Sequence, residues 1–490
     1  MMLRLLQNKR FGYLQSALVK NSAWGIIANI LQILFVFLFF AIVARLYAAD
    51  EFARFLISTT VYQLVAAFSS MGLGQWFIRQ YVVETDQTGF TAKFFKTQLG
   101  FGVLFYLLNI ILAYTLYNNY QLRMLCLIMG TNIIFDNFIN AIKTLNVVQN
   151  EQRKTAGILV IDGFLKLLIA CALFISPFSI ILLAGLMIVA RLLTLSLFIK
   201  MGSSNSISLA TIWSAAVSYH DVKQLIVKNW QFIVIGSISI IYWKIGNLII
   251  SKMLTLAHVA DYEVAFRIFS VLQIIPVIAS TTIYPQFIKH YNEGNIHKLK
   301  QLFNYIFIAY TVFAVLTYAF IYSFSGLIIP LAFGQGYPGA IVCMQQMFLT
   351  FLLLPTVLLQ ANLLVAIGAE KLDMWFNVAS LVINVAACFI GLYYYKNLAV
   401  INYSVLVSFL IFHLLQDVSL IKRKLMTVSH SIVFYVALIF TVLACRLLIQ
   451  NLNSYLAFAV FFLFTVMCVA LLLFGYKKSG LLNNLNSAKA

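Results

Sequence analysis

Charged residues are scarce in this sequence, and acidic ones are the scarcest. Asp, Glu, Lys and Arg make up 10% of the 490 residues, with only 14 Asp and Glu, whereas about a quarter of an ordinary soluble domain is charged. Long hydrophilic stretches are also missing, since the longest one between apolar runs is 200–228. A segment of that length cannot bury a core of its own. These absences exclude a soluble globular protein, an ATP-driven pump with a nucleotide domain, and a membrane enzyme with a large external domain.

Motifs that carry chemistry are missing as well. The six cysteines lie in or at the edge of apolar runs, with no C-x-x-C and no His pair at ligand spacing, so we expect neither disulfides nor a metal site. There is no Walker motif, no G-x-G-x-x-G after a strand, no H-E-x-x-H and no hydrolytic triad. We therefore expect no cofactor and no enzymatic activity. Nucleic-acid binding is excluded because the net charge of +19 is spread over short loops.

Apolar sequence is abundant, at 63% of the residues. Apolar runs of about 20 residues follow one another from Trp24 to Tyr476, and each is long enough to cross a hydrocarbon core of about 30 Å as a helix. We predict an all-α polytopic membrane protein with about 14 transmembrane helices. The predicted spans are 24–46, 52–77, 97–118, 123–147, 156–177, 178–200, 230–253, 261–288, 303–325, 338–364, 374–395, 398–420, 429–449 and 455–476.

Basic residues predict the orientation of these spans. Most of the 33 Lys and Arg residues fall in the N-terminal tail and at every second loop thereafter, as the positive-inside rule expects of cytoplasmic segments. Lys143, Arg153 and Lys154 form one such group. Both termini are therefore predicted to be cytoplasmic. The first apolar run is too long for a signal-peptide core and lacks an A-x-A site at its end, so we expect it to be retained.

A weak internal repeat divides the chain. It is carried by three residue pairs at a constant offset of 207 residues: Arg45 with Lys252, Ala53 with Ala260, and Phe55 with Tyr262. The offset spans six predicted helices, which implies two parallel six-helix halves related by a pseudo-two-fold axis along the membrane normal, with the substrate path between them. We expect an N-terminal half at 1–215, a C-terminal half at 216–425 and two additional C-terminal helices at 426–490.

The connection between the halves, 201–228, contains an amphipathic stretch around Trp213. One interpretation is a hinge in the cytoplasmic interface, with Ile212, Trp213 and Val217 facing lipid. An ordinary linker is the other interpretation, and the sequence favours neither.

Prolines indicate where helices bend, because a proline inside a helix frees a backbone carbonyl. Five of the six prolines lie between 276 and 355. Pro276 and Pro285 fall in the eighth span and Pro355 in the tenth. We expect these two helices to be bent and to rearrange during transport, although static kinks are common in membrane helices too.

Three stretches resemble a known family. The first comprises Asn21-Ser-Ala-Trp24, Ala44-Arg-Leu46, Asp50-Glu-Phe-Ala-Arg-Phe55 and Met71-Gly-Leu-Gly74; the second Ala260-Asp-Tyr262, Ala265-Phe-Arg-Ile268, Pro276 and Tyr284-Pro285; the third Pro330-Leu-Ala-Phe-Gly334, Tyr337-Pro-Gly-Ala340 and Gly368-Ala-Glu-Lys371. In order and spacing they are similar to the bacterial polysaccharide (O-antigen) flippases, of the multidrug/oligosaccharidyl-lipid/polysaccharide exporter superfamily. The family usually has glycine where this chain has Tyr47, Ala53 and Ala260, so its tight outer turns are expected to be built differently here.

The resemblance implies a function in the cell inner (cytoplasmic) membrane. Such a protein moves an undecaprenyl-pyrophosphate-linked oligosaccharide, an O-antigen or other surface polysaccharide repeat unit of the kind found in lipopolysaccharide, from the inner to the outer leaflet by alternating access. The expected partners are this lipid-linked glycan and membrane lipids, with a polysaccharide polymerase and chain-length proteins as further candidates.

Ionisable residues inside apolar spans are the candidate site, because each costs at least about 2.5 kcal/mol to insert. They are four cations, Lys166, Arg191, Lys244 and Arg267, and two acids, Asp136 and Asp162. The excess of cations suits a cavity that admits a pyrophosphate, and Arg191 and Lys244 are our first candidates because neither has an acid on its own helix.

The other four candidates have competing interpretations. Asp162 and Lys166 lie one helical turn apart, so they either line the cavity or neutralise each other. Arg267 either lines the cavity or pairs with Glu263. Asp136 and Asp162 are candidates for ion or proton coupling, but Asp136 would equally pair with Lys166 or Arg191 on another helix.

Two other functions compete with the flippase. A cation-coupled multidrug exporter of the same superfamily would favour acidic residues in its cavity and typically has twelve spans. A membrane-embedded polysaccharide polymerase or glycosyltransferase would show a sizeable outer loop with clustered Arg, Asp or His, and the outer loops here carry few charges.

Overall fold

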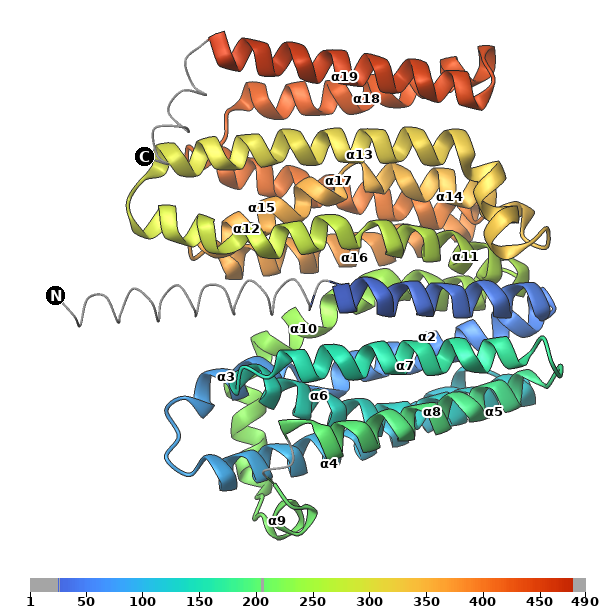
Figure 1. Cartoon of the computed structure of the whole chain (residues 1–490), viewed down its shortest axis with the longest axis vertical. Helices are drawn as coiled ribbons and strands as arrows, with labels where there is room; N and C mark the ends of the chain where they lie inside the picture. Colours follow the sequence, from blue (N-terminus) through green and yellow to red (C-terminus); the bar gives the residue numbers. More distant parts are fainter. Residues whose placement is uncertain (1–24, 26, 204–206, 479–490) are drawn as a thin grey trace, which may run out of the picture. The chain divides into compact units, whose positions relative to one another are not determined.

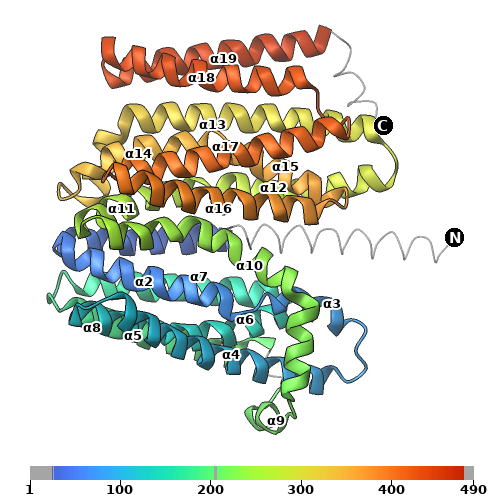
Figure 2. The same ribbon diagram turned by 180° about the vertical axis from the view of Figure 1, so that it is seen from behind.

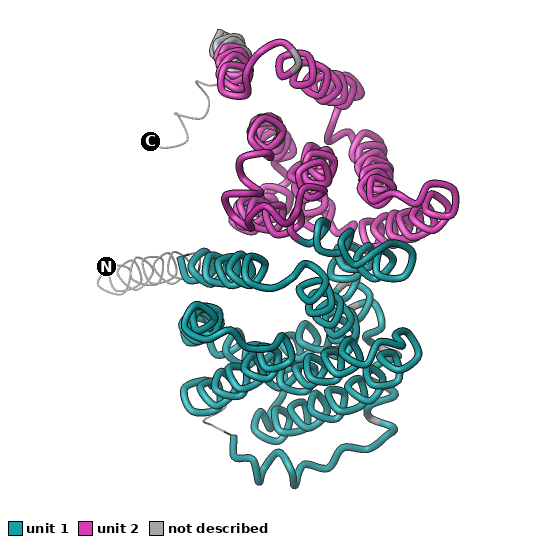
Figure 3. The backbone as a smooth tube through the Cα atoms, turned by 90° about the vertical axis from the view of Figure 1, so that its right-hand side faces the viewer, with its two compact units in different colours: residues 1–263 teal, residues 264–490 magenta. Residues whose placement is uncertain are grey.

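A computed structural model describes residue 25 and residues 27–203 and 207–478. These residues form α-helices joined by short connections, with no strand among them. The chain divides into two compact units, residues 1–263 and 264–490 (Figure 3).

The first unit begins with the helix Ile27–Leu46. It continues with α2 (Ala49–Ser69), α3 (Leu73–Tyr81), α4 (Gln87–Leu116), α5 (Tyr120–Gly130), α6 (Asn132–Val148), α7 (Gln152–Ala172), α8 (Ile180–Met201), α9 (Leu209–Ser214), α10 (Tyr219–Met253) and the first part of α11 (Leu256–Leu272) (Figure 1).

The second unit holds the rest of α11 and eight further helices. They are α12 (Ile274–Asn292), α13 (Ile296–Phe333), α14 (Pro338–Phe351), α15 (Leu354–Ala366), α16 (Glu370–Tyr394), α17 (Ala399–Lys422), α18 (Val428–Asn451) and α19 (Ser454–Lys478). The last two run side by side, and both pack on α13 (Figure 2).

Membrane spans account for nearly all of this structure. Thirteen helical segments of the described residues are long and apolar enough to cross a membrane, and the shorter apolar stretch Ser454–Met467 of α19 follows them. The expected all-α polytopic fold with about 14 membrane helices is confirmed. The predicted spans are correct in order, and the helices extend past most predicted ends because they continue into polar residues beyond the hydrocarbon.

Four spans are broken, and two of the breaks were expected from proline. The eighth span changes from α11 to α12 at Gln273, and the tenth from α14 to α15 after Phe351. Each break lies within a few residues before a proline, Pro276 and Pro355. A proline nitrogen has no hydrogen to give to the carbonyl four residues earlier, so the helix is interrupted there. The predicted bends in these two spans are confirmed.

The other two breaks were not expected. The predicted spans 52–77 and 123–147 are present as Ala49–Tyr81 and Tyr120–Val148, but each contains a break that the sequence did not indicate. The second span breaks between α2 and α3, where Met71 (φ 50°) and Gly72 (φ 59°) adopt left-handed backbone conformations. In the fourth span, the hydroxyl of Thr131 donates to the carbonyl of Ile128 and the amide of Asn132 to that of Met129. Side-chain bonds of this kind compete with the helical ladder.

The helix starts agree with the internal repeat. The second helix of the first half begins at Ala49 and its counterpart, α11, at Leu256. These starts lie 207 residues apart, which is the offset of the aligned residue pairs. The repeat therefore includes the start of the second helix in each half.

The connection 201–228 contains the short helix α9. Ile212 is buried (4% exposed) in an apolar cluster with Phe94 and Phe198, so the expectation that it faces lipid is wrong. Neighbouring residues of a helix differ by about 100° in direction. Trp213 therefore leaves the apolar cluster and is 75% exposed. Lys96 of α4 holds the end of α9 by donating to the carbonyls of Trp213 and Ala215 at 2.8 and 2.9 Å.

The crossing of α4 and α6 depends on a glycine and provides a test of the fold. A Cβ atom on Gly102 would lie 3.0 Å from the Cα of Ile134, whereas one on Gly100, half a turn earlier in α4, would meet nothing within 4 Å. We expect Gly102→Val to lower the stability of the purified protein by about 1–3 kcal/mol, because backbone atoms of α6 cannot move aside as a flexible side chain could. Thermal unfolding in detergent, monitored by size-exclusion chromatography, measures the loss.

The matched control is Gly100→Ala, which replaces glycine by a better helix former in open space. We expect its unfolding temperature to be unchanged or slightly raised. Equal losses in both variants would show that the α4–α6 contact does not limit stability.

Candidate functional site

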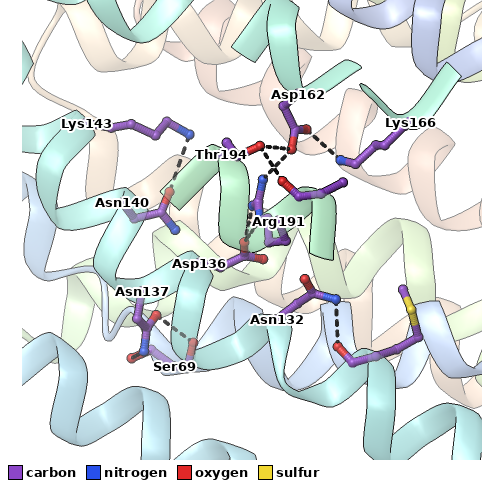
Figure 4. Close-up of polar contacts among 12 residues, drawn as sticks. Ser69, Asn132, Asp136, Asn137, Asn140, Lys143, Asp162, Lys166, Arg191 and Thr194 are labelled. Carbon is purple, nitrogen blue, oxygen red and sulfur yellow. Dashed lines mark hydrogen bonds and ion pairs between the residues drawn. The ribbon is translucent and has the colours of Figure 1, made fainter. Parts of the chain in front are cut away.

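Arg191 is the centre of a polar cluster in the first unit, built by α6, α7 and α8 (Figure 4). Its guanidinium, on α8, donates through Nε to Oδ1 of Asp136 on α6 at 2.8 Å and also bonds the same oxygen through Nη2. A third bond runs from Nη1 to Oδ1 of Asp162 on α7, at 3.3 Å. One guanidinium therefore bridges carboxylates from two other helices, a geometry that the planar fork of arginine permits and the point charge of lysine does not.

Asp162 is the most buried member of the cluster, with a side chain 1% exposed. Besides Arg191, it accepts bonds from Lys166 Nζ at 2.6 Å and from Thr194 Oγ1 at 2.9 Å. Thr194 lies three residues after Arg191, on the same face of α8. Two cations and a hydroxyl compensate the cost of burying this carboxylate. The mutual neutralisation of Asp162 and Lys166 is thus present, as one part of a larger network.

Asp136 is the more accessible carboxylate, with a side chain 15% exposed. Of the interpretations open to it, the pairing with Arg191 is the one found. Asn140 and Lys143 follow it along the same face of α6 at i+4 and i+7, and Lys143 Nζ donates to Asn140 Oδ1 at 3.4 Å (Figure 4). Lys143 lies within electrostatic reach of both carboxylates and Arg191.

The cluster carries three cations, Lys143, Lys166 and Arg191, and two carboxylates. With all five groups ionised, the cluster has one positive charge in excess. The side chains of Lys166 and Arg191 remain 19% and 17% exposed. These two cations are therefore partly accessible, whereas Asp162, which bonds both of them, is buried.

Lys244 belongs to a second cluster of the first unit. Its Nζ donates to Oε1 of Glu263 at 3.0 Å, and Asn247 donates to the same oxygen and to Oγ1 of Thr60 in α2. The side chains of Lys244 and Glu263 are 11% and 1% exposed. The predicted span 230–253 contains no acid, so Lys244 looked isolated along the sequence, but Glu263 of α11 supplies the acid in space.

Arg267 lies in the part of α11 that belongs to the second unit, and its side chain is half-buried. The structure thus brings four of the six predicted residues together, Asp136, Asp162, Lys166 and Arg191, and places Lys244 in a separate pair. Sequence reasoning assigned Lys143 to a loop and did not count Glu263 among the buried acids. The i, i+4, i+7 spacing of Asp136, Asn140 and Lys143 was the signal that could have found Lys143.

These features define a class of protein: a polytopic helical membrane protein whose charged residues form networks between its helices rather than on an external domain. The chain belongs to the family described as Polysaccharide biosynthesis protein, whose sequence pattern matches residues 18–291. Among curated proteins, none matches the chain in sequence at a significant level.

Solved structures share its fold. The lipid II flippase MurJ in an inward closed conformation superposes with a TM-score of 0.71 at 13% identity, covering 93% of this chain and 99% of MurJ. An inward-facing MATE family multidrug resistance transporter of the MOP superfamily gives 0.63 at 14% identity, covering 81% and 96%. A MOP superfamily transporter from Pyrococcus furiosus, described as having a binding pocket of reverse polarity, gives 0.55 at 15%, covering 83% and 96%.

Proposed function

We propose that this protein is a flippase that moves an undecaprenyl-pyrophosphate-linked oligosaccharide, the repeat unit of an O-antigen or another surface polysaccharide, from the inner to the outer leaflet. The observation that carries the proposal is the Arg191 cluster: a cationic network, one charge in excess, inside a membrane protein of a polysaccharide biosynthesis family. Moving a pyrophosphate headgroup across a membrane requires cations within the membrane, since each charge is costly there.

Arg191 suits a diphosphate because its guanidinium presents several donors in one plane, and phosphate oxygens accept them in pairs. When a diphosphate binds, the partner that gives way is Asp136, because it is the more exposed of the two carboxylates. Asp162 stays in place through Lys166 and Thr194. The exchange keeps the guanidinium bonded throughout, so no uncompensated cation is left in the membrane.

Asp136 then becomes a carboxylate without its guanidinium, and taking up a proton removes the cost of that charge. Anion binding at Arg191 is in this way linked to proton uptake at Asp136, which is the coupling role expected of this residue. Lys244 and Arg267, in other parts of the chain, are proposed to contact the headgroup at other stages of an alternating-access cycle.

The proposed location is the bacterial inner membrane, with both termini in the cytoplasm, where most loops rich in Lys and Arg would then lie. Partners in this setting are the lipid-linked glycan, a polysaccharide polymerase and chain-length proteins. The protein acts by translocation, with no covalent change to the glycan.

Lys143 provides the cleanest functional test, because its ammonium bonds a neutral amide rather than a carboxylate. We expect Lys143→Ala to lower surface polysaccharide severalfold in a flippase-null strain that wild type complements, without loss of membrane protein. The reason is that the cluster loses its excess positive charge while both carboxylates keep Arg191. Surface glycan and lipid-linked intermediate are measured at matched membrane levels.

Lys289→Ala is the matched control, since its side chain is 63% exposed in α12 and outside the cluster; it should behave as wild type. If wild type, well inserted and supplied with its native glycan pathway, restores no polysaccharide, the flippase proposal fails.

A second candidate function is a cation-coupled multidrug exporter. The observation that favours it is that the two charged clusters of the first unit hold three acids inside membrane helices, Asp136, Asp162 and Glu263. Resistance of a drug-sensitive strain to cationic compounds, lost on Asp136→Asn, would support this function over the flippase.

A further inference from the structure

A polar network in the second unit holds two ionisable residues that the sequence analysis did not single out. His413 and Asp417 lie one turn apart on α17, 0% and 2% exposed. They contact α15 through Thr356 and Gln360, and α18 through Tyr435. A histidine and an acid at i, i+4 in an apolar helix repeat the spacing of Asp162 and Lys166, and this signal was available in the sequence.

The hydrogen-bond contacts around His413 suit a ring that carries a hydrogen on both nitrogens. The hydroxyl of Thr356 donates to the carbonyl of Leu353 at 2.8 Å, so its one hydrogen is used. A hydrogen on His413 Nε2 would make the contact of 3.1 Å to Thr356 Oγ1.

The same count applies on the other side of the ring. Tyr435 uses its hydroxyl hydrogen to donate to Oδ2 of Asp417 at 3.2 Å. A hydrogen on Nδ1 would likewise make the contact of 2.7 Å between His413 and Tyr435 Oη. A ring that donates through both nitrogens is an imidazolium, and Nδ1 lies 3.4 Å from the Asp417 carboxylate.

We propose that His413, Tyr435 and Asp417 form a proton-binding site that clamps α18 to the rest of the second unit. The site holds one proton in either of two arrangements. In the first, the proton is on His413 and Asp417 is ionised. In the second, the imidazolium has given its Nδ1 proton to the Tyr435 oxygen while the Tyr435 hydroxyl proton has passed to Asp417, which leaves neutral histidine, tyrosine and carboxylic acid. Atoms and charge balance, and the network is neutral in both.

The side chains that face this site from neighbouring helices are neutral, so they add no charge that would compensate the Asp417 carboxylate. On α15, Gln360 Nε2 donates to Asp417 Oδ1 at 2.6 Å, and on α18 Ser431 donates to Oδ2. From α13, Phe307 packs against His413. These neighbours are uncharged.

Two ionisable residues stand near the site. Asp373 of α16 accepts from Gln416, the residue before Asp417, at 2.8 Å. His430 of α18 packs edge-on against Phe307, with ring centroids 4.5 Å apart, and lies within electrostatic reach of His413 and Asp417. Removing the bound proton therefore adds a negative charge beside an existing acid, and of these two residues His430 is the one that could take a compensating charge.

Loss of the proton has a structural consequence. Asp417 would keep its neutral donors, but it would face a neutral histidine in a dry site, which is costly for a carboxylate. Undocking α18 would expose the site to water and relieve this cost, so proton release and loosening of α18 are linked. Asp417 lies five residues before Lys422, about 7–8 Å along the helix axis, and therefore close to the membrane boundary that the positive-inside rule places in the cytoplasm.

The test is ¹⁵N NMR of the full chain in lipid nanodiscs, labelled only at its six histidines, between pH 5 and pH 9, with His413→Gln used to assign the ring. We expect His413 to carry hydrogens on both nitrogens at low pH and to lose one reversibly as the pH rises. In Asp417→Asn we expect the ring to lose its proton at a pH lower by about 1 unit or more, because the opposing carboxylate that favours the imidazolium is gone.

Tyr435→Phe serves as a second variant, since it keeps the aromatic ring and removes only the bridging hydroxyl; it too should lower the pH at which His413 deprotonates. His258→Gln, in the first unit, is the control and should leave the His413 signals unchanged. Hydrogen exchange of residues 428–440, corrected for intrinsic rates, should rise over the same pH interval. A His413 ring that keeps one protonation state from pH 5 to pH 9 in wild type overturns the proposal.

A coupling role for this proton rests on the proposed function, and the two fail separately. If His413 titrates but wild type restores no polysaccharide, the proton site stands and the flippase proposal falls. If wild type restores polysaccharide but His413 does not titrate, the flippase proposal stands and the proton-site proposal falls.

Discussion

Arg191→Ala is expected to abolish surface polysaccharide in the complemented strain, with a fall in translocation of at least about tenfold. Arg191 bonds two carboxylates on two other helices, and on our proposal the same donors receive the diphosphate. A hydrogen bond to a charged group contributes about 1.5–3 kcal/mol, and losing even one such bond on a phosphate changes an equilibrium by roughly that factor. Surface glycan is scored by gel or lectin binding, at matched protein levels in the membrane.

Loss of folding is the obvious competing explanation, because alanine at 191 leaves Asp136 and Asp162 without the guanidinium. The double variant Arg191→Ala/Asp136→Asn removes one of these charges and should recover much of the protein level without recovering translocation. Arg191→Lys keeps the charge but not the fork, and should retain partial activity at best. Wild-type glycan from Arg191→Ala at normal levels would show that the headgroup does not use this residue.

The spans could be predicted because a bilayer imposes a length and an apolar composition on every helix that crosses it. Breaks inside a span are not determined by length or apolar composition. Those near Pro276 and Pro355 follow from a missing backbone hydrogen, which the sequence shows directly. The turn at Met71 does not, because a non-glycine residue there adopts a positive φ (50°) that no apolar pattern encodes.

The candidate site shows the same division between local and non-local information. The bond between Asp162 and Lys166 was predictable because i, i+4 spacing places both on one face of a helix. Arg191 joins them from α8, 29 residues after Asp162, and only the packing of α8 against α7 determines that meeting. Which cation meets which acid across helices is set by packing and is absent from any single helix.

Lys143 was misplaced for a physical reason that applies to many membrane helices. Its charge grouped it with the cations of a cytoplasmic loop, although the predicted span 123–147 already contained it and α6 continues to Val148. A long lysine side chain near the end of a helix can extend along the helix toward its polar partners. The end of an apolar run therefore indicates where the hydrocarbon ends. It does not indicate where the polar cluster around Arg191 ends.

Lys244→Met is expected to lower the stability of the purified protein by about 3 kcal/mol or more, a larger loss than any surface substitution should cause. The ammonium of Lys244 bonds a Glu263 carboxylate that is 1% exposed, and removing one member of a buried ion pair costs about 3–5 kcal/mol because the other charge stays in a dry site. Asn247 continues to donate to Glu263 and keeps the position of the carboxylate, but an amide does not neutralise it. Thermal unfolding in detergent measures the loss.

The double variant Lys244→Met/Glu263→Gln separates this structural role from transport. Replacing both charges by neutral groups of similar size should restore stability to near that of wild type, since a buried pair often contributes little net stability against an uncharged replacement. If Lys244 also contacts the diphosphate, the double variant will be stable and still deficient in polysaccharide export. A stable double variant with wild-type export would assign the Lys244–Glu263 pair to helix packing alone, and the headgroup would then depend on the Arg191 cluster.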